Sequence, residues 1–593
     1  MKRLRSYIRR YWHRYSFGIF CTIITATLLT LIPRLSGMAV NSIQHGDYPR
    51  LERLTLLMIG AALLMGAARW FSRFVIFNCG RDIEYDLRND LFAHLEHLGL
   101  DFYQRLKTGD LMSRMINDLS NVRMMVGMVV LSFVNTPVTF LMALGMMFAL
   151  DWRLSLAAMV PYIGLFFEMR WLTRTLMERS LTVQEGLGAI GARVQESLSG
   201  IHVIKSYTLE DHDADHFRQI NEDYNEQGLA LARIRGVMMP MIRGTVGTSI
   251  MIVLIYGGYL IRGHLLSIGD MVAFMLFLGQ LAWPTVSLGW TLSLYQRGRA
   301  SMQRLEEIFD AAVVPSVAGN GQALQVSGAV EWDHVSFSYF AEDGDQSDHG
   351  VDGNGAGAPL RTWALRDVSV KVPAGGKLAI VGRTGSGKST MVRLLARLIE
   401  PTHGRILLDG RDIRDLPLGE LRHVIGMVPQ EPTLFSATIA QNVAFGRTGA
   451  SKEQIAQASH TAGLDPDIAV MPRGFETVVG ERGMSLSGGQ KQRLTIARLL
   501  VYNPSIVVLD DALSSVDTET ERAVLASLEA SVSGRTTIVV AHRASTVRDA
   551  DEIIVLDEGR VAERGTHAQL MARRCIYAEL FHRQLLEEEL ASY

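Results

Sequence analysis

Residues 377–393, KLAIVGRTGSGKSTMVR, decide how the second half of the chain folds. An apolar strand runs into a glycine-rich loop of the pattern GxxxxGK[ST], and a helical stretch follows. Glycines let backbone N–H groups surround phosphate oxygens, and the N-terminus of the helix adds a partial positive charge. The segment therefore predicts a phosphate-binding loop between a strand and a helix of an α/β domain.

This loop supplies the first expected nucleotide contacts. Lys388 would reach the β- and γ-phosphates, and the Ser389 hydroxyl would be a ligand of Mg²⁺. The expected contacts in this segment are Gly382, Arg383, Thr384, Gly385, Ser386, Gly387, Lys388, Ser389 and Thr390. Kinases, GTPases and motor proteins carry such a loop as well, so residues elsewhere must identify the reaction.

Length and composition place this domain inside a larger protein. The chain has 593 residues, more than one compact domain usually holds. Hydrophobic residues reach 48% and charged residues still reach 20%, which indicates a membrane half and a soluble half. The net charge of −2 provides no basic field for nucleic acid. Three cysteines without metal-ligand spacing exclude a disulfide scaffold and fit a reducing cytosol or a bilayer interior.

The first half of the chain contains six apolar segments that can cross a membrane as helices. Roughly 20 helical residues, at about 1.5 Å each, cross the hydrocarbon core. The predicted spans lie near residues 16–43, 54–76, 124–150, 154–172, 236–261 and 271–296. An even number of spans places both ends of this transmembrane domain, residues 1–310, on one side of the membrane.

The distribution of charge predicts which side that is. The first fifteen residues carry six Lys or Arg and no acid, and the apolar run that follows is too long for a signal peptide. We therefore expect an uncleaved first span. The three short connections between spans hold only four Arg, whereas the two long connections hold many more cations. Because positive charge favours the cytoplasmic side, the N-terminus and the long connections are predicted to be cytoplasmic in a bacterial-type inner membrane.

The two long connections keep the periodicity of helices, as the spacing of apolar residues over 83–98 illustrates. We expect the transmembrane helices to continue as long cytoplasmic extensions and then to turn back. The glycine-containing segments Phe102–Arg114 and Ser197–Asp211 are the candidates for these two turns.

After Asp310 the sequence changes character. Residues 311–325 are rich in Gly, Pro and Ala and are predicted to be a linker. Short β-rich runs then alternate with helical stretches, which predicts a nucleotide-binding domain over residues 326–575. Residues 576–593 are interpreted as a helical tail. The acidic, Gly-rich insertion at residues 341–359 lacks the spacing of a calcium loop and is interpreted as a disordered surface loop.

A second motif identifies the type of P-loop protein. Residues 486–490, LSGGQ, followed by KQRLTIAR, resemble the signature motif of ATP-binding cassette (ABC) transporters. Six spans fused ahead of one cassette resemble an exporter-type half-transporter over essentially the whole chain. The implied fold is an α-helical transmembrane bundle followed by an α/β P-loop ATPase domain with a helical subdomain. The implied activity is ATP hydrolysis coupled to export or flipping of a hydrophobic or amphipathic substrate, with ATP and Mg²⁺ as cofactors.

The resemblance also implies roles for single residues. Tyr339 matches the aromatic residue that stacks on adenine, and Asp510, at the end of an apolar run, matches the Walker B acid. Gln430 matches the Q-loop residue, and His542 matches the switch histidine. The implied Mg²⁺ ligands are Ser389, Gln430 and Asp510, and the implied catalytic residues are Asp511, His542 and Gln430.

The signature motif predicts a dimer. It opens a helix whose N-terminus can bind an anion. In the resembled family this helix closes over ATP held by the other cassette. The residues Ser487, Gly488, Gly489 and Gln490 are therefore expected to contact ATP bound to a second half-transporter.

One residue departs from the family pattern. A Glu usually follows the Walker B acid and acts as general base on the attacking water, whereas this sequence has Asp511. Asp is one methylene shorter, and a base must lie within about 2.6–3.2 Å of the proton that it abstracts. Our hypothesis is an asymmetric heterodimer, in which this chain forms a slow site and its signature completes the competent site of a partner carrying Glu. Alternatively, the backbone shifts and Asp511 works well.

Other functions remain open at this point. A homodimeric lipid or drug flippase would use Asp511 twice, and a pull-down of a different half-transporter would separate it from the heterodimer. A membrane-bound ATP-binding regulator without transport is a rival of another class, which ATP-dependent accumulation in inverted vesicles would refute. Import is a minority use of the same architecture.

Charges inside the spans are the best pointers to the substrate, because an intramembrane charge is costly. Arg69 and Arg73 lie one turn apart in the second predicted span, and Glu168 and Arg243 lie at similar depths in the fourth and fifth. An anionic or amphipathic small molecule, lipid or peptide could contact these arginines. Alternatively, Glu168 pairs with an Arg and the others extend to lipid phosphates.

Overall fold

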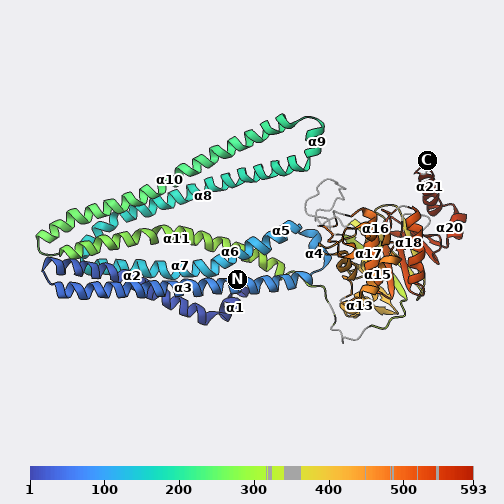
Figure 1. The fold of residues 1–593 in the computed structure, drawn as a ribbon, viewed down its shortest axis with the longest axis horizontal. Helices are drawn as coiled ribbons and strands as arrows, with labels where there is room; N and C mark the ends of the chain where they lie inside the picture. Colours follow the sequence, from blue (N-terminus) through green and yellow to red (C-terminus); the bar gives the residue numbers. More distant parts are fainter. Residues whose placement is uncertain are drawn as a thin grey trace, which may run out of the picture. The chain divides into compact units, whose positions relative to one another are not determined.

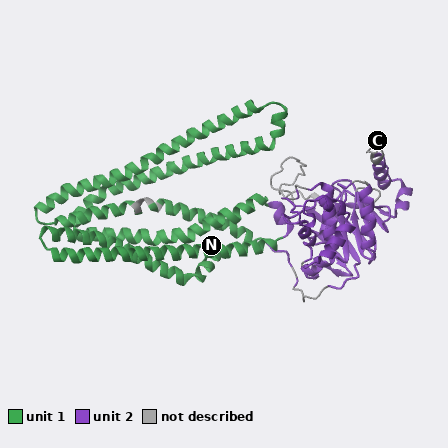
Figure 2. Cartoon of the chain, in the orientation of Figure 1, with its two compact units in different colours: residues 1–98, 106–311 green, residues 99–105, 312–593 purple. Residues whose placement is uncertain are grey.

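The computed structural model describes the chain as two compact units (Figures 1 and 2). The first comprises residues 1–98 and 106–311, and the second comprises residues 99–105 and 312–593. The residues described are 1–315, 317, 324–339, 362–447, 449–480, 483, 486–516, 518–541 and 547–591.

The first unit is built from long helices. They are α1 (Lys2–Arg10), α2 (Trp12–Gln44), α3 (Tyr48–Glu96), α5 (Thr108–Ser113), α6 (Leu119–Met124), α7 (Val130–Leu150), α8 (Trp152–Ser199), α9 (Ile201–Ser206), α10 (Glu210–Arg262) and α11 (Ile268–Phe309). Two π-helical turns, η1 (Arg114–Asp118) and η2 (Met125–Val129), join α5, α6 and α7 into one continuous helical run. By length and composition, α2, α3, the run Thr108–Leu150 and α10 could each cross a membrane.

The three short connections end on residues that cap the next helix. The side chain of Asp47 accepts a hydrogen bond from the Arg50 amide, and that of Asp151 accepts one from the Leu154 amide. Ser267 caps α11 in the same way. A capping oxygen satisfies one of the amides that the first turn of a helix leaves unpaired. Each of these helices therefore begins at a defined residue.

The first long connection turns earlier in the chain than its glycine suggests. Helix α3 ends at Glu96, the short helix α4 (Leu100–Arg105) follows, and α5 already begins at Thr108. Gly109 therefore lies in the first turn of α5, where a glycine costs less than in a helix interior. The second connection turns between Gly200 and Glu210, around α9, and α8 and α10 form a long antiparallel hairpin (Figure 1).

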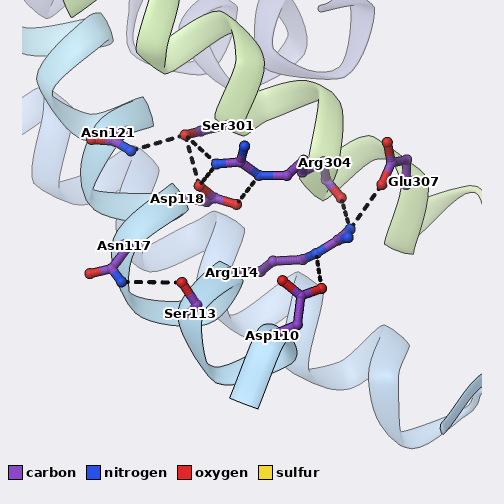
Figure 3. A network of polar contacts seen from close by, with 9 residues as sticks. All are labelled: Asp110, Ser113, Arg114, Asn117, Asp118, Asn121, Ser301, Arg304 and Glu307. Carbon is purple, nitrogen blue, oxygen red and sulfur yellow. Dashed lines mark hydrogen bonds and ion pairs between the residues drawn. The ribbon is translucent and has the colours of Figure 1, made fainter. Parts of the chain in front are cut away.

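A polar network joins the helical run to α11 (Figure 3). Asp118, the last residue of η1, is buried and accepts hydrogen bonds from the Ser301 hydroxyl at 2.8 Å and from Arg304 Nε at 2.9 Å. Asn121 donates to the Ser301 hydroxyl at 3.0 Å. The extra residue of a π-turn re-aims the side chains that follow it. The network fixes the N-terminal half of the run to the end of α11.

The second unit contains two sheets. One is antiparallel, in the order β2-β1-β4-β5; the other has the order β10-β9-β3-β8-β7-β6 and is parallel except for β10. The strands are β1 (Val330–Tyr339), β2 (Thr362–Val372), β3 (Lys377–Gly382), β4 (His403–Leu408), β5 (Arg411–Asp412), β6 (Ile425–Val428), β7 (Ile506–Asp510), β8 (Thr536–Val540), β9 (Glu552–Asp557) and β10 (Arg560–Gly565).

Helices cover the sheets and complete two hydrophobic cores. They are α12 (Lys388–Leu395), α13 (Leu418–Val424), α14 (Ile439–Ala444), α15 (Lys452–Thr461), α16 (Asp465–Val470), α17 (Gly488–Tyr502), α18 (Thr518–Ser531), α20 (His567–Arg573) and α21 (Ile576–Ala591). The central strands alternate between the two cores: Val507 and Leu509 of β7 face one, and Ile506 and Val508 face the other. A strand buried on both faces is apolar throughout, which holds its C-terminal end at a fixed position.

Candidate nucleotide-binding site

The phosphate-binding loop follows β3 and leads into α12. Gly382, Gly385 and Gly387 have φ angles of 149°, 83° and 100°, a region that side chains disfavour. A Cβ at Gly387 would overlap the carbonyl oxygen of Ala364 on β2. Glycine is therefore required here both for backbone conformation and for space. The loop lies at the carboxyl end of a parallel strand, where open α/β sheets bind ligands.

Lys388 extends back across this loop. Its ammonium donates hydrogen bonds to the carbonyl oxygens of Gly382 at 2.8 Å and Arg383 at 2.9 Å, and the residue is only 6% exposed. Burial lowers the pKa of Lys388, while the carboxylates of Asp511 and Asp510 act in the opposite direction. A buried cation held by the carbonyl oxygens of a glycine-rich loop is a suitable partner for phosphate.

Ser389 and Asp510 lie together beside the loop. The Ser389 hydroxyl donates to Asp510 Oδ1 at 3.0 Å, and Asp510, at the end of β7, is 1% exposed. Burial raises the pKa of Asp510, while the hydrogen bond from Ser389 and the charge of Arg393 lower it. A hydroxyl and a carboxylate side by side are hard oxygen donors of the kind that Mg²⁺ prefers. These residues therefore fit the expected metal ion.

Ser386 provides an independent observation on the loop. Its hydroxyl is buried and has no hydrogen-bond partner in the described part of the chain. A buried hydroxyl without a partner is costly unless a ligand supplies one. Its place inside the loop fits an anion with several acceptor oxygens, as in a nucleotide triphosphate.

Tyr339 reaches the same region from the other sheet. It ends β1, and its hydroxyl lies 3.1 Å from the Thr390 hydroxyl on α12. Its ring packs edge-on against Phe337, with the ring centroids 4.8 Å apart. Two residues expected to contact nucleotide are thus brought into direct contact, although 51 positions separate them in the sequence.

Asp511 follows Asp510 in an unusual backbone conformation. Its φ is +50°, and its amide donates to the Val540 carbonyl at 2.8 Å, which anchors it to β8. Among the described residues, none donates a hydrogen bond to the Asp511 carboxylate. Gln430 is exposed just beyond β6, which pairs with β7 in a register that aligns Val428 with Leu509. Both side chains are free to contact a ligand.

The signature residues form the capped N-terminus of α17. Ser487 and Gln490 make a reciprocal capping box, and Ser487 and Gly488 are exposed. A Cβ at Gly489 would lie 3.0 Å from the Ser515 carbonyl oxygen, so α17 packs closely on the segment that follows β7. Among the described residues, the phosphate-binding loop makes no hydrogen bond with this helix N-terminus.

Sequence reasoning missed Gln492. Its amide donates to the Ser514 hydroxyl at 3.0 Å and accepts from the Ser515 amide at 2.9 Å, so it ties the signature helix to the segment after Asp511. Gln492 is 2% exposed. The available signal was a glutamine on the same face of the helix as Thr495, Ile496 and Leu499.

Several expected features lie outside the described residues. They are the proposed switch histidine His542 and the insertion at residues 341–359. In the first unit, Glu168 and Arg243 are exposed on α8 and α10, and no ion pair of Glu168 with an Arg occurs among the described residues. Arg69 contacts the sulfur of Met65, 3.9 Å away on the same helix.

Comparison with protein families matches both units. The family described as "ABC transporter transmembrane region" matches residues 15–285, and the family described as "ABC transporter" matches residues 365–514. The second match contains the phosphate-binding loop, the signature motif and the Asp510–Asp511 pair.

Full-length relatives show the same arrangement. A probable multidrug resistance ABC transporter ATP-binding/permease protein, YheI of Bacillus subtilis, is 34% identical over 99% of this chain and 98% of its own length. An ATP-dependent lipid A-core flippase of Syntrophus aciditrophicus is 32% identical over 99% of this chain and 95% of its own length. A solved structure of a bacterial Atm1-family ABC exporter with ATP bound is 31% identical and has a TM-score of 0.76, covering 97% of this chain and 98% of that one.

Proposed function

This chain belongs to the ABC transporter family as an exporter-type half-transporter, and we propose that it works in a heterodimer in which its own ATP site hydrolyses slowly. It is a membrane protein that binds ATP and couples ATP hydrolysis to export. ABC exporters work as dimers, so the open question is which second chain completes this one.

We propose the following division of work at the chain's own site. Lys388 and the loop amides bind the β- and γ-phosphates, and Tyr339 stacks on the adenine. Ser389, Asp510 and Gln430 would hold Mg²⁺, which when bound neutralises charge on the phosphates. A water oxygen attacks the γ-phosphorus as the bond to the β-phosphate oxygen breaks, and Asp511 is the group available to accept the water proton.

The single observation that carries the proposal is the anchored backbone of Asp511. Its carboxylate is one methylene shorter than that of Glu, so a competent site would need the backbone to move toward the nucleotide. The amide of Asp511 is bonded to Val540, and the residue already has a positive φ. These two restraints oppose a compensating shift. A base that stays too far from its proton loses much of the roughly 10²–10⁴-fold contribution of general base catalysis.

The signature helix supports the second half of the proposal. Its N-terminus is exposed and capped, and among the described residues it makes no hydrogen bond with the chain's own phosphate loop. We propose that it closes over ATP bound to a partner half-transporter whose Walker B acid is followed by Glu. His542 would contact the γ-phosphate at the chain's own site.

Helix α4 suggests how the cassette is coupled to the spans. Residues 99–105 belong to the second unit although they lie between two helices of the first, and Leu100 packs against the core around β1 and β3. We propose that movement of the cassette is transmitted through this helix. The two ATP molecules would bind best to the closed dimer, and that differential affinity drives the change.

Location and substrate class follow from charge and from the relatives. We propose an inner-membrane location with the N-terminus and the nucleotide-binding domain in the cytoplasm. The relatives include a multidrug resistance protein and a lipid A-core flippase, which favours a hydrophobic or amphipathic substrate. The exposed Arg73, Glu168 and Arg243 would contact its polar part.

A homodimeric flippase is the second candidate. The observation that favours it is that this chain carries both a complete phosphate loop and a complete signature motif. Two copies would then supply every element of both sites, with Asp511 used twice.

Substitutions in the assembled transporter separate the two candidates. In the heterodimer, Asp511→Ala changes ATP turnover little, whereas Gly488→Asp lowers it strongly because the partner's site loses its helix N-terminus. A pull-down from native membranes recovers a different half-transporter. In that case we also expect the isolated chain to hydrolyse ATP poorly. Equal losses of turnover from both substitutions, together with recovery of this chain alone, would establish the homodimer instead.

A further inference from the structure

Helix α1 is fixed against the first unit by one of its faces. Leu4 and Tyr7 are buried, and the Tyr7 hydroxyl donates a hydrogen bond to Asp90 on α3. The guanidinium carbon of Arg3 lies 4.1 Å from the centre of the Phe309 ring at the end of α11. The helix therefore has a defined rotation relative to α3 and α11.

An acidic ladder on α3 neutralises part of the N-terminal charge. Asp82 and Asp86 lie one helical turn apart, in line with Asp90. Arg14 pairs with Asp82, and Arg10 pairs with Asp86, each at 2.7 Å between nitrogen and oxygen. Arg10 and Arg14 therefore have carboxylate partners within the folded chain.

Three other cations, all on α1, form no ion pair with this row of carboxylates. Lys2, Arg5 and Arg9 are exposed. At 3.6 residues per turn they share the side of α1 opposite to Leu4 and Tyr7. In the described part of the chain, no carboxylate forms an ion pair with any of them. We name this surface, made of Lys2, Arg5 and Arg9, the α1 basic face.

Aromatic residues that begin the first span lie directly after this face. Trp12, Phe17 and Phe20, near the start of α2, are exposed at 51%, 50% and 60%. Aromatic side chains gather where a membrane meets water, and basic side chains beside them lie at the level of lipid phosphates. The α1 basic face is thus held within a few turns of the membrane surface.

We propose that the α1 basic face binds the headgroups of anionic phospholipids in the leaflet next to the start of α2. Charge complementarity selects this occupant, because three cations without acid partners among the described residues attract lipids of net negative charge, whereas a zwitterionic lipid also carries a cation that offsets its phosphate. A second copy of this chain is disfavoured at this face, because it would present the same three cations.

Lipid retention by the full-length protein tests the proposal. Because the experiment contains no nucleotide, a negative result would count against this proposal and not against the proposed function. The protein is released from mixed bilayers of phosphatidylglycerol and phosphatidylcholine, and native mass spectrometry measures the ratio of the two lipids retained. The wild type prefers phosphatidylglycerol, less so at high salt. The triple variant Lys2→Gln, Arg5→Gln, Arg9→Gln loses preference by up to roughly fivefold for each cation removed.

A matched control removes the same charge elsewhere. The variant Arg411→Gln, Lys452→Gln, Arg560→Gln replaces three exposed cations of the second unit and keeps the wild-type lipid preference. Phosphatidylglycerol also raises the melting temperature of the wild type more than that of the α1 variant, because a ligand of the folded state stabilises it. An α1 variant with unchanged lipid preference overturns the proposal. So does an α1 variant that dissociates a dimer while its lipid preference stays the same.

Discussion

At the scale of single residues, two adjacent carboxylates occupy very different environments. Asp510 is buried and hydrogen-bonded by Ser389, which makes it a fixed oxygen donor. Asp511 has an anchored backbone with a positive φ, and no described residue donates a hydrogen bond to its carboxylate. A single peptide bond thus separates a proposed metal ligand from a proposed base, and their surroundings assign the two roles.

Lengthening Asp511 should restore catalysis. Asp511→Glu places the carboxylate one methylene further along the same anchored backbone, so we expect ATP turnover by the isolated chain to rise roughly tenfold or more. Phosphate release under saturating Mg-ATP measures this. Asp511→Asn is the control, because it has the original side-chain length without the charge. Its ATP turnover should not exceed that of the wild type. A Glu variant no faster than the wild type would show that reach is not what limits this site.

Neutralising Asp510 should raise the stability of the nucleotide-free protein and abolish its ATP hydrolysis. Burial raises the pKa of Asp510, so the ionised carboxylate costs folding free energy at every pH above that pKa. Asp510→Asn removes this cost and keeps the contact with Ser389. We expect the nucleotide-free protein to melt at a higher temperature at pH 7, by about 2–4 °C for each kcal/mol relieved.

The sign of the pH dependence follows from the same shift. Below its unfolded pKa near 3.8, Asp510 is neutral in both folded and unfolded states. The melting temperatures of the wild type and of Asp510→Asn should therefore converge as pH falls. Differential scanning fluorimetry over a pH series measures the difference. Mg-ATP hydrolysis should be lost in the variant at all pH values. A variant that melts lower than the wild type at pH 7 would contradict the desolvation argument.

At the scale of elements, helices approach most closely where residues are small. Gly37 on α2 faces Gly269 on α11, and a Cβ at Gly269 would overlap the carbonyl oxygen of Gly37. The Gly269 amide donates to the Asn41 side chain at 2.8 Å, and Arg34 pairs with Asp270 at 2.7 Å. Small residues let helix backbones meet, and polar side chains then join them across the contact.

A methyl group at this contact should separate the two helices. Gly269→Ala forces the backbones apart and weakens both polar contacts, so we expect a loss of about 1–3 kcal/mol of stability. The matched control is Gly279→Ala on the same helix, where no neighbouring atom of the described residues lies within 4 Å of the added Cβ. Thermal inactivation in detergent compares the two variants. Equal melting of both would show that the close approach is not required.

The network around Asp118 makes a prediction of the same kind (Figure 3). Arg304→Gln leaves the buried Asp118 carboxylate with fewer donors, which should cost roughly 2 kcal/mol. Arg114→Gln is the control, because its partners Asp110, Glu307 and the Arg304 carbonyl oxygen are in exposed contacts that water can replace, so its loss should stay within about 1 kcal/mol. Proteolysis of the junction between α5 and α11 measures local opening. A larger loss of stability in Arg114→Gln than in Arg304→Gln would show that the exposed ion pairs, and not the buried Asp118, stabilise this junction.

At the scale of the whole molecule, one chain holds two halves of different sites. Its phosphate loop and its signature helix make no hydrogen bond with one another among the described residues, and under the proposed function a second cassette completes each of them. In that arrangement the dimer is part of the chemistry and not only of the architecture. Binding of two nucleotides can then be converted into one movement of the spans.

Complementation between two defective copies tests this arrangement. Lys388→Ala disables one phosphate loop and Gly488→Asp disables one signature helix. Each variant alone should retain little ATP, whereas a mixture contains dimers in which one intact loop faces one intact helix. We expect ATP retention on a filter to recover in part, as random pairing dictates. No recovery in the mixture would mean that two copies of this chain do not complete each other's sites.

The sequence by itself determined the fold class, which the family matches and the solved exporter confirm. Apolar segments long enough for a bilayer and a glycine loop between strand and helix are local patterns, so no tertiary information is needed to recognise them. Tertiary structure decided what depends on contacts between distant residues: Tyr339 against Thr390, Gln492 bridging to Ser515, and two of the six N-terminal cations paired with carboxylates on α3. Such contacts join residues far apart in the chain, and only the folded backbone brings them within hydrogen-bond or ion-pair distance.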